Sequence, residues 1–253
     1  MRVVYGMNPV RELLRAGGEG IAELWLAEGA GRGRAFDELT RLSRRTAAKV
    51  RTAPRQKLDR LAGSQAHQGV VAVVSDYRYR DLDELIAAAG ASGEPPLLVL
   101  LDGVEDPQNL GAIVRSAHAL GAHGVVIPRD RAAGVTPAAA KASAGAVEHC
   151  PVARVVNLTQ TLERLKGLGI WSVAADAEGE RPLPEVDLTG PVALVVGGEG
   201  RGVRPLVKRT CDHIARIPMT GQVASLNASV AAAIVLYEAA RQRRAGGGAT
   251  PGK

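Results

Sequence analysis

From residue 97 onward, short apolar stretches typical of buried strands alternate with stretches whose apolar residues have helical spacing. Such alternation favours an α/β fold with a mostly parallel sheet and helices on both faces, because parallel strands need crossover connections. The predicted strands span residues 97–101, 124–127, 152–156, 170–174, 192–196 and 213–217. The predicted helices span residues 109–120, 137–146, 158–166, 203–209 and 226–243.

A smaller α/β unit is predicted to precede this sheet. Residues 1–75 contain a helical pattern after Asn8-Pro9, predicted strands over 21–27 and 70–74, and a basic helix over 35–48. Residues 76–96 are predicted to be a linker, since they hold one short helix and end in Gly-Glu-Pro-Pro. We expect a second domain over 97–243 and a disordered tail over 244–253, which lacks apolar residues that could anchor it.

The charge of the chain is unevenly distributed. Residues 1–80 carry 15 basic and 8 acidic side chains, whereas residues 81–253 carry 17 basic and 18 acidic ones. The first domain is therefore the candidate contact for a polyanion such as RNA, although a basic surface can also serve solubility alone. Since the chain has only seven aromatic residues, recognition through phosphates and RNA shape is favoured over base stacking.

Several classes of protein are disfavoured by composition. The longest apolar stretch, residues 230–237, is far shorter than the roughly 20 residues that a membrane span needs. The first residues lack the apolar core of a signal peptide, and two cysteines do not make a disulfide framework. We therefore expect a cytoplasmic protein that needs no membrane.

Three loops that follow predicted strands carry the candidate site residues. Loop 101–115 holds Asn109 and Arg115, the glycine-rich loop 195–202 holds Glu199, and loop 217–227 holds Ser225 and Asn227. Ligands of open α/β sheets bind at the carboxyl ends of strands, which favours a shared site. The competing interpretations are helix capping for the asparagines and the serine, a solvated cation for the arginine, and a plain turn for the glycines.

Two further points bear on these loops. Arg115 lies six residues after Asn109, about 240° around an ideal helix, so the two share a site only if Asn109 lies off the helix. The apolar residues of the third loop, Ile217, Met219 and Leu226, are candidates either for the core or for the wall of a cofactor pocket. No histidine or cysteine has metal-ligand spacing, and neither a Walker A motif nor GxSxG occurs, so no metal is expected.

Three segments in order closely resemble the motifs of the SpoU (TrmH) family of RNA ribose 2′-O-methyltransferases, which use S-adenosylmethionine. They read DGVEDPQNLGAIVRSAHALGA, ALVVGGEGRGV and IPMTGQVASLNASVAAAIVLYEAARQR, and the resemblance covers residues 97–243. The stretches VYGMNPVRELL and HQGVVAVV are similar to the RNA-binding extension of bacterial members that methylate a guanosine ribose in 23S rRNA.

The resemblance implies a C-terminal trefoil knot, a homodimer, and rRNA or a ribosomal precursor as partner. By motif position, it implies catalytic roles for Asn109, Arg115, Glu199, Ser225 and Asn227. It implies S-adenosylmethionine binding, mainly through the backbone, at Gly197, Ile217, Met219 and Leu226.

Three alternatives remain open at this point. The same chemistry can act on tRNA, and the fold can serve a non-catalytic RNA-binding factor in ribosome assembly. A nucleotide-dependent oxidoreductase also fits the strand and helix alternation, but the chain lacks an early GxGxxG motif with its acidic partner.

Overall fold

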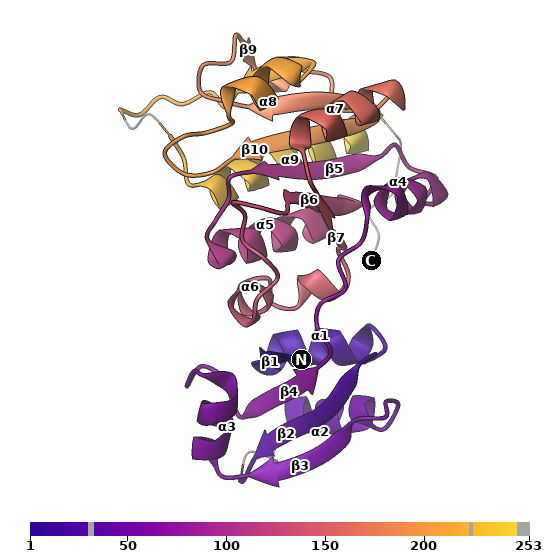
Figure 1. Ribbon diagram of the computed structural model, residues 1–253, viewed down its shortest axis with the longest axis vertical. Helices are drawn as coiled ribbons and strands as arrows, with labels where there is room; N and C mark the ends of the chain where they lie inside the picture. Colours follow the sequence, from indigo (N-terminus) through magenta and orange to yellow (C-terminus); the bar gives the residue numbers. More distant parts are fainter. Residues whose placement is uncertain (30–32, 223–224, 247–253) are drawn as a thin grey trace.

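The computed structural model describes residues 1–29, 33–222 and 225–246, and it divides into two α/β units, each with its own sheet (Figure 1). The N-terminal sheet has four strands in the order β1-β4-β2-β3, with β2 and β3 parallel and the other pairs antiparallel. Its elements are β1 (Arg2–Tyr5), α1 (Met7–Arg15), β2 (Ile21–Ala27), α2 (Arg34–Ser43), β3 (Lys49–Ala53), α3 (Arg55–Ala62) and β4 (Val70–Val74).

The helices of this unit cover the two faces of its sheet unequally. Helices α1 and α2 bury their leucines against one face, around Leu24 and Val70. The short α3 inserts Leu58 beside Trp25 and Val71 on the other face. Sequence reasoning missed β1, β3 and α3, and the basic helix predicted over 35–48 ends at Ser43.

The C-terminal sheet has seven strands in the order β7-β6-β5-β10-β8-β11-β9, and every pair is parallel. Its strands are β5 (Leu97–Asp102), β6 (Gly124–Pro128), β7 (Val152–Val155), β8 (Trp171–Ala175), β9 (Arg181–Pro182), β10 (Val192–Gly197) and β11 (His213–Arg216). The central strands read as unbroken apolar stretches because both of their faces are buried, as parallel sheets require. The predicted α/β class with a mostly parallel sheet is confirmed.

Helices cover both faces of this sheet (Figure 1). One face packs against α5 (Pro107–Ala119), α6 (Pro137–Ala142), the 3₁₀ turn η1 (Ala146–Glu148) and α9 (Ala228–Gly246). The other packs against α4 (Leu82–Ala91), α7 (Leu158–Gly167) and α8 (Pro205–Thr210). A second 3₁₀ turn, η2 (Leu183–Glu185), follows β9. No helix in the described part of the chain is long and apolar enough to cross a membrane.

The segment predicted as a linker is packed against the C-terminal sheet rather than extended. The Tyr77 hydroxyl accepts a hydrogen bond from the Val152 N–H at 3.2 Å, and burial raises the pKa of this phenol. Helix α4 begins with a capping box at Asp81 and buries Leu82 and Leu85 in the second core cluster. Residues 77–91 therefore belong structurally to the C-terminal unit.

The two units meet where β1, α1 and the loop before β4 contact α6 and η1. Arg2 forms an ion pair with Glu148 at 2.8 Å, and both side chains are nearly buried. Lys141 Nζ donates to the Ala66 carbonyl oxygen at 3.1 Å. The predicted disordered tail begins three residues too early, since α9 continues to Gly246, and the rest of it lies outside the described residues.

Candidate active site

The candidate site lies where the strand order reverses. Strands β5, β6 and β7 follow one another toward one edge, and β10 then pairs with β5 on its other side. Such a switch point leaves a crevice at the carboxyl ends of the two strands, where ligands bind in α/β folds. Two adjoining cavities of about 560 and 510 Å³ open here, and both are lined by residues 198, 199, 201, 202 and 228. Each is within the size range of small-molecule sites.

Three predicted polar residues meet at the wall between these cavities. Asn109 Nδ2 donates to Glu199 Oε1 at 2.8 Å, and Asn227 Nδ2 donates both to that oxygen and to Asn109 Oδ1, the latter at 3.1 Å. Their positions lie up to 118 residues apart in sequence, on α5, after β10 and before α9. The fold therefore brings three segments that are far apart in the sequence together in one polar cluster.

Capping explains part of this cluster but not all of it. Asp106, not Asn109, caps α5 by accepting the Gln108 N–H at 2.9 Å, so the competing interpretation of Asn109 as the cap of this helix is wrong. Asn109 is in the first turn, buried, with its amide turned toward Glu199. Asn227 does cap α9: its Oδ1 accepts the Ser229 N–H at 2.9 Å while its Nδ2 serves the cluster.

Arg115 does not join the cluster within one chain. It is exposed on α5, and neither cavity includes it among the described residues that line them. Because Asn109 lies on the helix, the offset of about 240° directs the two side chains to different faces. Ser225 does line the second cavity, at its exposed rim.

The second cavity brings together all four residues predicted to hold the cofactor. Gly197, Ile217, Met219 and Leu226 line it, with Val196, Ala228 and Ala231 adding to its apolar wall. Met219 and Leu226 are 39% and 37% exposed, so two large apolar side chains face solvent at the rim of the pocket. A flat apolar ligand would cover them.

The glycine-rich loop closes tightly against the end of β10. A Cβ atom on Gly197 would lie 2.0 Å from the carbonyl carbon of Gly202, and one on Gly198 would lie 1.9 Å from the Gly103 oxygen. The Gly198 N–H donates to the Asp102 carbonyl oxygen at 2.8 Å. These contacts require glycine at both positions and present backbone groups directly to the cavity.

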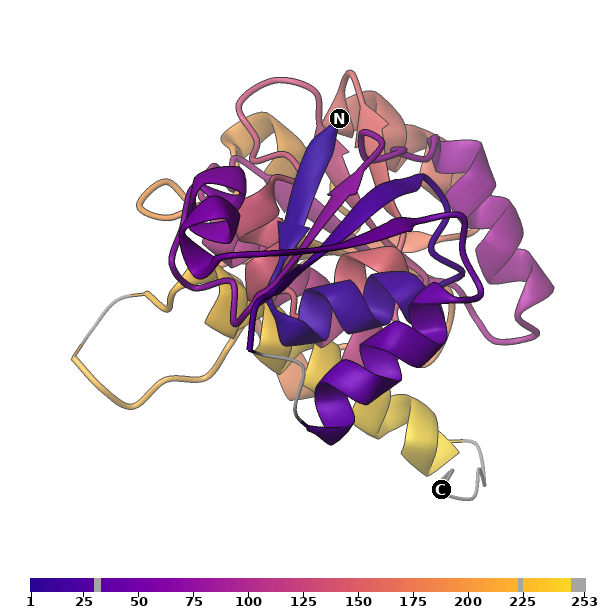
Figure 2. The ribbon, with the colours of Figure 1, turned by 90° about the horizontal axis from the view of Figure 1, so that it is seen from below.

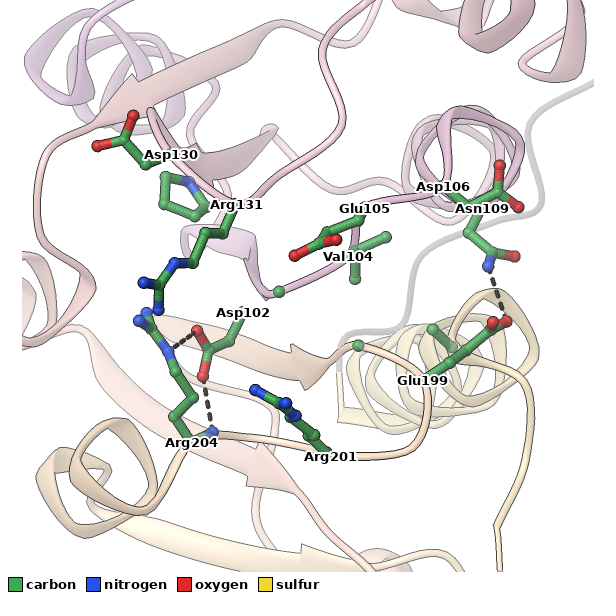
Figure 3. A pocket seen from close by; sticks show the side chains of 15 residues that line it. Asp102, Val104, Glu105, Asp106, Asn109, Asp130, Arg131, Glu199, Arg201 and Arg204 are labelled. Carbon is green, nitrogen blue, oxygen red and sulfur yellow. Dashed lines mark hydrogen bonds and ion pairs between the residues drawn. The ribbon is translucent and has the colours of Figure 1, made fainter.

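Apart from Glu199, sequence reasoning missed the charged residues of the first cavity. Asp102, wholly buried at the end of β5, accepts hydrogen bonds from the backbone N–H and Nε of Arg204, both at 2.7 Å. Figure 3 shows Arg131 and Arg204 on one side of this cavity and the bonded Asn109 and Glu199 on the other. Asp102 could have been recognised from the sequence, because it is a charged residue directly after a run of apolar residues.

The second cavity also has a polar rim that was not predicted. Lys208 Nζ forms an ion pair with Asp176 at 2.7 Å, and the hydrogen bond that the ammonium donates to this carboxylate raises the pKa of the lysine. Glu178 lies 3.2 Å from the same nitrogen. All three line the cavity, so its polar rim carries one lysine ammonium held between two carboxylates.

Nucleophilic cysteine and metal chemistry have no support in the described residues. Burial raises the pKa of Cys150 and Cys211 to about 12, so both thiols are protonated near neutral pH. Within residues 1–29, 33–222 and 225–246, no group of three or more His, Cys, Asp or Glu side chains could hold a metal ion.

Comparison with known proteins identifies the family. The profile of the SpoU rRNA Methylase family matches residues 96–237, and that of the RNA 2′-O ribose methyltransferase substrate-binding domain matches residues 3–80. The two profiles thus define the class as an RNA methyltransferase with a separate substrate-binding domain. The chain belongs to the SpoU (TrmH) family.

Relatives and solved structures agree with this assignment. A Bacillus subtilis protein whose name assigns it to the TrmH family of tRNA/rRNA methyltransferases is 47% identical over 240 residues, covering 95% of both chains. The SpoU methyltransferase AviRb from Streptomyces viridochromogenes, solved with S-adenosylmethionine (AdoMet), aligns with a TM-score of 0.80 and 30% identity, covering 96% of this chain and 90% of its own. An AdoMet-bound rRNA methyltransferase from Sinorhizobium meliloti aligns with a TM-score of 0.77 and 26% identity, covering 95% and 87%.

Proposed function

We propose that this protein transfers a methyl group from S-adenosylmethionine to a ribose 2′-hydroxyl of 23S rRNA, at a guanosine, in the cytoplasm. The supporting observation is the Asn109–Glu199–Asn227 cluster at the wall shared by two cavities. One cavity would hold the methyl donor and the other the target nucleotide, so that the cluster lies between donor and acceptor.

The second cavity fits S-adenosylmethionine. Its volume of about 510 Å³, its apolar wall and its exposed Met219 and Leu226 suit a ligand with a flat ring. Gly197, Ile217, Met219 and Leu226 are the proposed holders of the cofactor. When bound, S-adenosylmethionine supplies an electrophilic methyl group on a sulfonium centre.

The chain's own residues would position the ribose. Two amides engage Glu199 Oε1, whereas Oε2 has no donor in the described part of the chain and can accept a hydrogen bond from the ribose 2′-hydroxyl. Ser225 and the asparagines would fix the ribose in an orientation suited to in-line displacement. These contacts would raise the rate by orientation, with no covalent intermediate on the protein.

Arg115 is the proposed stabiliser of the developing oxyanion, acting from a second copy of the chain. Helices α5 and α9 also carry an apolar surface, and Tyr237 on it is 57% exposed; its members include Ala112, Leu120 at the end of α5, Val230, Ile234 and Tyr237. A homodimer through this face would bury these side chains and bring each guanidinium toward the partner's site.

Mixed dimers would test this arrangement. Arg115→Ala and Asn227→Ala variants would each be inactive, but subunit exchange between them should restore about a quarter of the activity, since half the dimers carry one intact site. Failure to recover activity between two folded, dimeric variants would assign both residues to the same subunit's site.

The trefoil knot remains part of this proposal. After β11, which lies near one edge of the sheet, residues 217–222 and 225–227 return to the switch point and lead into α9, which packs on α5. If residues 217–222 and 225–227 pass through the loop formed by an earlier segment of the chain, the chain is knotted. The cofactor pocket would then be built from the threaded residues and from the segment that surrounds them.

Methyl transfer into defined RNAs tests the function. Labelled S-adenosylmethionine is supplied with 23S rRNA and, separately, with tRNA, both from a strain lacking this gene, and ribose methylation is mapped. Label at one rRNA guanosine is expected. Label in tRNA alone would move the substrate to tRNA, and cofactor binding without transfer would indicate an assembly factor. No binding heat with S-adenosylmethionine or its demethylated product would overturn the proposal.

A further inference from the structure

The positive charge of the N-terminal domain is concentrated in one short segment. Residues 41–60 carry eight basic side chains and one acidic side chain, whereas the remainder of residues 1–80 carries seven of each. Three of the eight lie at the C-terminal end of α2, two on β3 and three on α3, and all eight are exposed. We call this segment the basic edge.

Strand β3, at the centre of the basic edge, lies far from the junction of the two domains. In the order β1-β4-β2-β3, strand β1 contacts α6 of the C-terminal unit and β3 forms the opposite edge, about 14 Å away across three strand spacings. Figure 1 shows β3 at the end of the molecule remote from the methyltransferase sheet. Figure 1 places α3 on the side toward which β5 and β10 end, and Figures 1 and 2 both show residues 217–222 projecting on that side.

Most of these cations are not neutralised by the protein. Within the described residues, only Arg51 of the eight has a carboxylate at ion-pair distance, Glu23 at 2.9 Å. The one acidic residue, Asp59, is already bonded to the buried His67 at 2.8 Å. Most of the positive charge of the basic edge is therefore free to attract a polyanion.

In the described part of the chain, the basic edge presents no accessible aromatic ring on which an RNA base could stack. Trp25 is 7% exposed, and its ring is covered by Lys57, whose Nζ lies 4.0 Å from the ring centroid, and by Arg51 at 5.4 Å. Binding of single-stranded RNA relies on stacking of bases on accessible rings. Double-helical RNA is bound instead through phosphates and backbone shape.

Protection against aggregation does not account for this charge. Charged side chains on an edge strand block pairing with other sheets, and Lys49 and Arg51 on β3 would suffice for that. Six of the eight cations lie on or next to helices, outside the edge strand. Their position extends the charged surface around the domain, as contact with a wide polyanion requires.

We propose that the basic edge binds the phosphates of a double-helical RNA segment that is remote from the methylated nucleotide. This inference rests on the proposed function and adds the structural class of RNA that the domain recognises. Because the edge and the methyltransferase site lie in different domains, the substrate must be a folded RNA large enough to span both.

The test uses the full-length protein and three exposed cations of the edge that make no side-chain hydrogen bond or ion pair among the described residues. The variant K49Q/R55Q/R60Q is compared with R181Q/R209Q/R244Q, which removes equal charge from the surface of the C-terminal unit. Affinities for a 20-base-pair RNA duplex and for a 20-nucleotide poly(U) strand are measured over a range of salt concentrations.

We expect the edge variant to lose at least tenfold in affinity for the duplex, with the slope of log K against log salt falling by about 2–3. The control variant should stay within about threefold of the parent. Equal losses in both variants, or poly(U) binding as tightly as the duplex, would overturn the inference.

A separate measurement distinguishes this failure from failure of the proposed function. Binding of S-adenosylmethionine by calorimetry should be unchanged in the edge variant, because no edge residue lines the second cavity. If the parent protein binds duplex through the edge yet binds no cofactor, the inference about the edge stands and the proposed function does not.

Discussion

Replacement of Gly197 by alanine tests the tight closure of the glycine-rich loop. The added Cβ would lie 2.0 Å from the Gly202 carbonyl carbon and 2.2 Å from the Val203 nitrogen, whereas ordinary contacts begin at 3.4 Å. Because these neighbours are backbone atoms, the loop must move by about 1.4 Å, the difference between the two distances. Overpacking of this kind costs about 1–3 kcal/mol in the free energy of unfolding.

The displaced loop also carries Glu199, two residues away. A misplacement of about 1 Å in a catalytic arrangement can lower the rate by about 10²-fold, so we expect methyl transfer to fall by that order. Cofactor affinity, measured by calorimetry, should fall at least tenfold, since the loop lines the second cavity. Urea denaturation gives the change in the free energy of unfolding.

Gly190→Ala is the matched control, because a Cβ there meets nothing within 4 Å and its φ is not in the left-handed region. It should leave the free energy of unfolding, the cofactor affinity and methyl transfer nearly unchanged. If Gly197→Ala unfolds with the same free energy as the parent protein, the steric reasoning is refuted. If the variant is less stable but binds the cofactor as tightly as the parent, the loop is not part of the cofactor site.

Three further predictions concern single side chains. Asn227→Asp keeps the oxygen that caps α9 but sets a second carboxylate against Glu199 in place of the Nδ2 donor, so methyl transfer should collapse and the free energy of unfolding should fall; Asn227→Ala, which loses the cap without adding a charge, should lose about 1 kcal/mol by denaturation. Arg204→Gln leaves the buried Asp102 carboxylate with one backbone donor and should cost about 1–3 kcal/mol in urea, partly restored by adding Asp102→Asn. Burial, then the charge of Arg243, lowers the pKa of His123, so the unfolded chain takes up the proton first and stability should drop as pH falls below about 6.5. His123→Asn should reduce that pH dependence, and an unchanged pH profile would contradict it.

The sequence predicted the C-terminal sheet well because its strands are buried on both faces. Unbroken apolar runs such as 97–101 and 192–196 have one structural interpretation, and the observed strands extend each by a single residue. Strand β3 was missed because four of its five residues are exposed, so its sequence KVRTA shows no core pattern. The two-residue β9 and the packed segment 77–91 depend on tertiary contacts that local patterns do not encode.

The sequence predicted which residues gather at the candidate site, but not the hydrogen bonds that join them. Motif positions named Asn109, Glu199 and Asn227, yet only the insertion of β10 beside β5 brings the loops that bear them to one point. The Asp102–Arg204 pair escaped notice because its residues are 102 positions apart and neither belongs to a recognisable pattern. Helical geometry did anticipate that Arg115 would point away from Asn109 if both lay on α5.

Capping and membership of the polar cluster are not competing interpretations of Asn227, because one amide serves both. Its Oδ1 accepts the N–H of Ser229 at the start of α9, and its Nδ2 donates toward Asn109 and Glu199. Aspartate or serine would cap the helix equally well. An aspartate would place a second carboxylate against Glu199, however, and a serine has one proton where the cluster uses two amide hydrogens. The requirement for an acceptor and two donors in one side chain therefore selects asparagine at this position.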